Sequence, residues 1–195
     1  MFKLVQGGGH AKPALTLAVR QNLPFGRHDS MELEPHELTT GSGAATTSLA
    51  LHGQIYSIVA GRTLRSRANL KWSLPYDDAA VHGESVYGTP AGSEGRVDLH
   101  GGWEATFGFE YALNARWVLA TDVVYERNRG FETSGESPAG AFASVHGSSW
   151  RTSLAPAVEY HFNDNVGLIA GAFVSVAGRN SSVIVAPQVA VNVAF

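Results

Sequence analysis

The chain has 195 residues and a formal net charge of −3, and only 16% of its residues are charged. The small negative charge excludes the basic surface through which proteins bind nucleic acid by neutralising its phosphates. The absence of cysteine excludes disulfides, thiol catalysis and thiolate metal sites, while 22 glycines and 10% aromatic residues favour strands joined by tight turns.

The first twelve residues, 1–12, are expected to be a flexible lead-in or a truncated start, and 13–195 a single β-domain. Residues 1–12 hold no basic region followed by about 7 to 15 apolar residues, so no signal peptide is expected in them. No stretch reaches the roughly 18 uninterrupted apolar residues of a spanning helix. If this chain meets a bilayer, we expect it to do so with strands.

Alternation of apolar and polar side chains, the period of a β-strand, recurs about eight times along the chain. The split is sharpest between Arg65 and Leu74, where four polar side chains oppose four apolar ones. The run 97–113 keeps its phase throughout and is expected to be one long strand. The expected strands cover 13–22, 48–59, 65–74, 97–113, 117–126, 150–162, 166–177 and 183–195.

The expected connections alternate between short and long. Short links have the Gly, Asn and Asp composition of hairpin turns, and long links are rich in Gly, Ser, Asp, Glu and His. This order is typical of bacterial outer-membrane barrels, which have short periplasmic turns and long external loops. Only 178–182 departs from it, being short on the external side. The short links are 60–63, 114–115 and 163–165, and the long ones are 24–46, 75–96 and 126–149.

Large aromatic side chains lie on the apolar face near the expected strand ends. Such amphipathic rings suit the headgroup level of a bilayer, and outer-membrane barrels carry them as girdles. We therefore predict that they mark the membrane interfaces. The predicted interface aromatics are Trp72, Trp103, Trp117, Trp150 and Tyr160.

The chain finishes on an aromatic residue preceded by apolar residues at every second position. Val189, Val191, Val193 and Phe195 look like the C-terminal signal that the barrel-assembly machinery reads. A soluble ligand-binding barrel would use the same alternation in the opposite sense, with the apolar face inward. The terminal pattern together with the alternating connections favours the membrane interpretation.

The polar face of the expected barrel would line its interior. We consider two roles for its charges: they set the selectivity of a lumen, or they pair across a narrow interior and hold the barrel together. Pairing is the interpretation we favour. The lumen-lining candidates are Arg65, Arg67, Lys71, Asp98, Glu104, Glu110, Asp122, Arg151 and Glu159.

Neither a metal site nor an enzyme is favoured by the remaining motifs. The eight histidines form no helical pair with metal-ligand spacing, so no metal and no cofactor are expected. No Gly-x-Ser-x-Gly elbow is present, and Ser153 lies too far along one strand from His161 to hydrogen-bond with it. Gly7-Gly8-Gly9 lacks the Lys-Ser or Lys-Thr of a phosphate loop.

Three segments resemble the outer-membrane, transporter-like family called MetA-pathway of phenol degradation. They are Lys12-Pro13-Ala14-Leu15-Thr16-Leu17, Thr40-Gly41-Ser42-Gly43, and Phe107-Gly108-Phe109-Glu110-Tyr111-Ala112-Leu113-Asn114-Ala115-Arg116-Trp117. The resemblance runs from about Lys12 to Phe195 and consists of strand and turn patterns. It implies a channel for aromatic or other hydrophobic compounds, on a fold whose members carry a signal peptide and further N-terminal strands.

The sequence therefore predicts an all-β, antiparallel, up-and-down transmembrane barrel, or a fragment of a larger one, in the outer membrane of a Gram-negative bacterium. Its expected function is a pore or transporter for small molecules rather than an enzyme. Its expected partners are outer-membrane lipid, the barrel-assembly machinery and a small solute. The alternatives are a plugged barrel with a structural or surface-recognition role, and a soluble ligand-binding barrel.

Overall fold

The structure is a computed structural model that describes residues 1–5, 7, 9–31 and 40–193. The described residues form thirteen strands in two sheets and no α-helix, and every strand pairing is antiparallel. No helix long and apolar enough to cross a membrane is found in the described ranges. The all-β, antiparallel prediction is confirmed.

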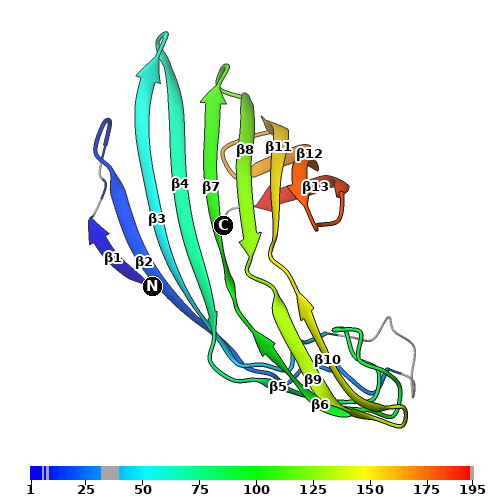
Figure 1. The fold of residues 1–195 in the computed structure, drawn as a ribbon. Helices are drawn as coiled ribbons and strands as arrows, with labels where there is room; N and C mark the ends of the chain where they lie inside the picture. The colour runs from blue at the N-terminus through cyan, green and yellow to red at the C-terminus, as the bar shows by residue number, and fades with distance from the viewer. Residues whose placement is uncertain (6, 8, 32–39, 194–195) are drawn as a thin grey trace.

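The larger sheet has nine strands and curves strongly across its width (Figure 1). Its long strands reach 14 residues, and the tight turns that join them lie together at one end, which we call the turn end. In spatial order its strands are β1 (Phe2–Val5), β2 (Ala14–Asn22), β3 (Thr46–Val59), β4 (Arg62–Pro75), β7 (Gly102–Ala112), β8 (Trp117–Asn128), β11 (Ser149–His161), β12 (Val166–Arg179) and β13 (Val185–Val193).

The long connections build a second sheet, which the sequence did not predict. They meet at the opposite end of the molecule, the loop end, where four strands pair in the order β10-β9-β6-β5 (Figure 1). We call this four-stranded sheet the loop sheet. Its strands are β5 (Ala79–His82), β6 (Glu94–Leu99), β9 (Phe131–Ser137) and β10 (Gly140–His146).

The prediction of a single strand over 97–113 is wrong, because the strand is interrupted between Leu99 and Gly102. Gly101 has a φ of 72°, and a Cβ there would lie 2.2 Å from the carbonyl oxygen of Ser73. This left-handed turn sends β6 to pair with β9, while β7 pairs with β4 and β8. The alternation keeps the same phase on both sides of this interruption, so periodicity alone could not detect it.

The nine-stranded sheet is not closed within the described residues, since β1 and β13 are its two edges. It also holds one strand more than the expected eight, because β1 forms within the expected lead-in and pairs with β2. The edge strand β1 covers only four residues.

The buried hydrophobic core lies in the loop sheet rather than on the large sheet. Among the described residues, Ala44, Ala79, Val81 and Val97 form a buried cluster, and Phe131 packs beside it. The large sheet instead leaves many of its big apolar side chains uncovered, including Phe107 at 54% and Val189 at 72% exposure. The described residues therefore form no covering layer over this apolar sheet face, and soluble proteins rarely leave so large an apolar surface open.

Candidate functional site on the polar face of the large sheet

The register of the large sheet separates its side chains into two faces. We call the face that carries Leu70, Phe107 and Val123 the outer face, and the opposite face the polar face. Four charged residues of the polar face occupy one row across four neighbouring strands. Lys71 pairs with Glu104, Glu104 with Glu126, and Glu126 with Arg151.

The two cations at the ends of this row each bind the carboxylate beside them. The Lys71 Nζ lies 2.6 Å from Glu104 Oε2, and the Arg151 Nε donates to Glu126 Oε2 at 2.9 Å. The two carboxylates lie opposite one another in register, and they would repel each other if either lacked its cation. The row is therefore neutral overall and depends on both cations.

A second charged cluster lies closer to the turn end. Glu110 accepts from Arg65 Nη1 at 3.1 Å, and its other oxygen lies 3.0 Å from Arg67 Nη2. Arg67 Nη2 also donates to Asp122 Oδ1 at 3.3 Å, and Arg65 Nη2 donates to Gln54 at 2.9 Å. Two cations and two anions thus form a connected network across β3, β4, β7 and β8.

Gly108 is what allows this network to span β7. In register it lies between Arg67 on β4 and Asp122 on β8, and it is buried. A Cβ at Gly108 would come 2.3 Å from Asp122 Oδ1 and 3.1 Å from Arg67 Nε. The ion pair therefore passes over the backbone of a strand that has no side chain at that point. We call the two charged groups together the charge belt.

The structure thus brings together seven of the nine lumen-lining candidates. Glu159 also lies on the polar face, 3.7 Å from His161, near the turn end. Asp98 lies apart, on β6 of the loop sheet, because of the break at Gly101. Glu126 and Gln54 also lie on the polar face, as the alternation of their strands predicts. Gly108 has no side chain, so only cross-strand register identifies its place in the network, and the sequence does not provide that register.

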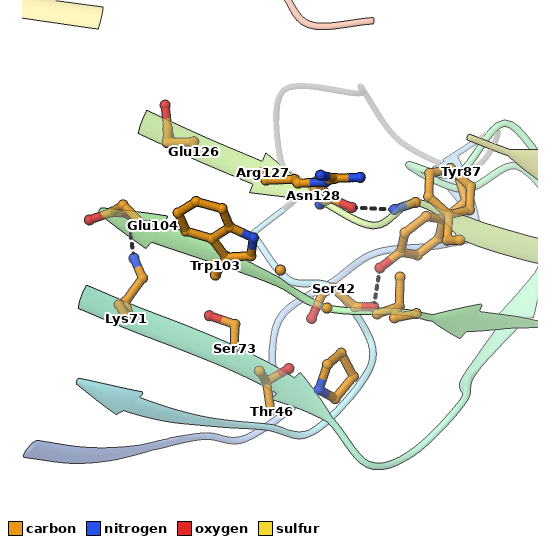
Figure 2. A pocket seen from close by; sticks show the side chains of 16 residues that line it. Ser42, Thr46, Lys71, Ser73, Tyr87, Trp103, Glu104, Glu126, Arg127 and Asn128 are labelled. Atoms are coloured by element: carbon orange, nitrogen blue, oxygen red, sulfur yellow. Dashed lines mark hydrogen bonds and ion pairs between the residues drawn. The ribbon is translucent and has the colours of Figure 1, made fainter. Parts of the chain in front are cut away.

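A cavity of about 430 Å³ opens between the charge belt and the loop sheet (Figure 2). The belt contributes Lys71 and Glu104 to its lining, and the loop side contributes Tyr87 and Phe131. The Tyr87 hydroxyl donates to the backbone carbonyl of Ser42 at 2.5 Å, and burial raises the pKa of this phenol. The cavity joins hydrogen-bonding groups and apolar rings at the loop end, as small-molecule sites do.

Aromatic rings gather in two bands on the outer face. At the loop end Tyr125 lies between Trp103 and Trp150, with ring centroids 4.9 and 6.1 Å away. At the turn end the rings of Trp117 and Tyr160 lie 4.6 Å apart. Between these bands, the outer-face positions of β4, β7, β8 and β11 carry no charged side chain. These positions are the alternate residues within 64–72, 103–111, 117–125 and 150–160.

The predicted interface aromatics and the predicted assembly-signal residues lie on the outer face wherever the structure describes them. Trp72, the remaining interface aromatic, pairs in register with Trp103 and is 43% exposed. Val189, Val191 and Val193 lie on β13 and are exposed. Phe195, the last residue of the predicted assembly signal, lies outside the described residues.

Within the described ranges, no group of three or more His, Asp or Glu side chains could hold a metal ion. Comparison with known proteins does not place the chain in a family. No protein-family model matches it, and a search of curated proteins finds no match. The resemblance to the phenol-degradation family stays a prediction.

Proposed function

We propose that this chain forms the wall of an outer-membrane β-barrel through which small molecules pass. The proposal rests on how side chains are distributed over the two faces of the large sheet, which is the reverse of the distribution in a soluble protein. Large apolar side chains are exposed on the outer face, while charged side chains are half-buried and paired on the polar face. This arrangement suits a sheet with lipid outside and water or polar groups inside.

The dimensions of the outer face support a bilayer as its covering. Trp103 and Tyr111 are eight residues apart on β7, which corresponds to about 26 Å along a strand. With the usual tilt of 35–45°, this spans about 20 Å along the membrane normal, near the roughly 25 Å apolar band of such barrels. A charged side chain in that band would cost a few kcal/mol, and β7 has none on this face.

Closure of the barrel would require more than the nine strands of the large sheet. Because neighbouring strands are antiparallel, an odd number makes β1 and β13 run in the same direction. Antiparallel closure then needs at least one further strand, in agreement with the even strand numbers of bacterial outer-membrane barrels. Barrel diameter grows with strand number, so a barrel of ten or more strands would enclose more space beside the belt than one of eight strands.

The pairing within the charge belt favours a second candidate, a barrel that is plugged and serves a structural or recognition role. Each belt cation neutralises a carboxylate, so the belt presents little net charge to a passing ion. Solute passage nevertheless fits the cavity at the loop end, whose apolar rings suit small hydrophobic or aromatic molecules. The two candidates differ in whether folded protein conducts.

Conductance measured in a planar bilayer distinguishes the pore from the plugged barrel. Two single variants of the ion pair between Lys71 and Glu104 are compared. Glu104→Gln leaves Lys71 unpaired and should shift the reversal potential towards anion preference. Lys71→Gln leaves Glu104 unpaired and should shift it towards cation preference. Asp98→Asn on the loop sheet is the matched control and should shift it less. Folded protein that conducts no ions and causes no liposome swelling would reject the pore in favour of the plugged barrel.

A further inference from the structure

Tryptophan and arginine alternate in one row across the outer face at the loop end. The register pairs Trp103 on β7 with Arg127 on β8, Arg127 with Trp150 on β11, and Trp150 with Arg179 on β12. Trp150 thus has an arginine on each side. Neighbouring strands are about 4.8 Å apart, so the two arginine backbones are separated by about 10 Å. Two side chains of this length can reach a single headgroup.

Neither arginine of this row has an anionic partner among the described residues. Arg127 and Arg179 are both exposed, and no carboxylate of the described residues lies within 4.0 Å of either guanidinium. The arginines of the charge belt differ in this respect, because each of them binds a carboxylate. Two unneutralised cations at the border of an apolar face make that border attractive to anions.

The chemistry of these side chains indicates which anion fits. A guanidinium presents a planar fork of donors that matches phosphate oxygens, and indole rings favour the headgroup level of a bilayer. An anion held here would lie directly above the apolar band of the outer face. A phosphate attached to acyl chains satisfies both surfaces, since its chains would cover the apolar band.

We propose that Arg127 and Arg179 bind the phosphate of a lipid headgroup in the leaflet at the loop end, with Trp150 packing between them. This inference rests on the proposed membrane location of the sheet. Such a site would select lipids by their headgroup, whereas the apolar outer face alone would contact any acyl chain equally.

The test titrates the full chain, folded in uncharged detergent, with phosphatidic acid and separately with diacylglycerol, and counts bound lipids by native mass spectrometry. Diacylglycerol has the same chains without the phosphate. The variant is Arg127→Gln with Arg179→Gln. The matched control is Arg62→Gln with Arg116→Gln, which removes two exposed arginines from the turn end. Inorganic phosphate at the same concentration serves as the competitor.

We expect the loop-end variant to bind phosphatidic acid about tenfold to thirtyfold more weakly, from about fivefold for each arginine. The turn-end variant should change by less than about threefold. Equal losses in both variants, equal binding of diacylglycerol, or displacement by equimolar inorganic phosphate would each overturn the inference. Heat-modifiable gel mobility is measured on the same samples. If the unsubstituted chain shows no preference for phosphatidic acid over diacylglycerol but keeps its heat-modifiable mobility, this site alone is rejected. A fold that forms without detergent rejects the proposed function as well.

Discussion

Phe107 and Thr106 are adjacent on β7 and point to opposite faces, so an arginine at each tests the two faces separately. Phe107 lies four residues from both Trp103 and Tyr111, at the centre of the apolar band, and is 54% exposed. Thr106 lies on the polar face, two residues from Glu104 and opposite Asn69. The new cation of Thr106→Arg would therefore have a carboxylate within reach.

The expected magnitudes follow from the surroundings of each position. Phe107→Arg places a charge near the bilayer midplane and should lower the free energy of unfolding by about 2–4 kcal/mol. Thr106→Arg should change it by less than about 1 kcal/mol, because its charge stays among polar groups. If water covered the outer face instead, Phe107→Arg at a half-exposed site would cost about 0.5 kcal/mol or less.

The assay is reversible urea unfolding of both variants and the unsubstituted chain, refolded into phospholipid vesicles and followed by tryptophan fluorescence. The ratio of the two effects is informative even if the absolute stabilities depend on the lipid. A Thr106→Arg variant that loses as much stability as Phe107→Arg would show that the two faces are assigned wrongly. A neutral Phe107→Arg would show that no lipid covers the outer face.

Three further predictions concern separate parts of the molecule. Gly108→Ala should lower the free energy of unfolding by about 1–3 kcal/mol, since its Cβ would displace Asp122 from Arg67. Gly53→Ala, whose Cβ would meet only contacts of 3.7 Å or longer, should be nearly neutral, and equal losses in urea unfolding would remove the role assigned to Gly108. Burial raises the pKa of Tyr87 above 10.0, so the folded state holds that proton more tightly and stability should decline as pH rises above about 10. Tyr87→Phe should weaken this decline, measured as unfolding midpoint against pH, and an unchanged decline would assign it to other groups. Phe195→Ser should reduce the amount of assembled barrel in outer-membrane fractions without reducing synthesis, and normal assembly would exclude Phe195 from the signal.

Side-chain periodicity was sufficient to assign the faces of the large sheet. Leu70 and Lys71 were expected on opposite faces, and the register with β7 puts them opposite Ala105 and Glu104, as alternation requires. The pattern is readable because one face carries no charge between its aromatic bands, whereas the other carries the charge belt. The structure shows pairing of these charges between neighbouring strands, for example of Lys71 with Glu104, while pairing across a closed interior stays a prediction.

Periodicity was insufficient wherever a turn preserved the phase. Val97 and Trp103 have the same parity, so the left-handed turn at Gly101 between them left no trace in the alternation. The loop sheet was missed for another reason. Its strands are short, such as Ala79–His82, and are stabilised by contacts between connections far apart in the sequence. Gly108 could be recognised as part of the belt only after the register placed it between Arg67 and Asp122.

The most direct test of the central claim is gel mobility with and without boiling, combined with the detergent dependence of folding. We predict a folded band that shifts on boiling and β-structure that forms only with detergent or lipid. A stable fold in detergent-free buffer, with no shift on boiling, would contradict the membrane account and make the apolar face a surface covered by protein.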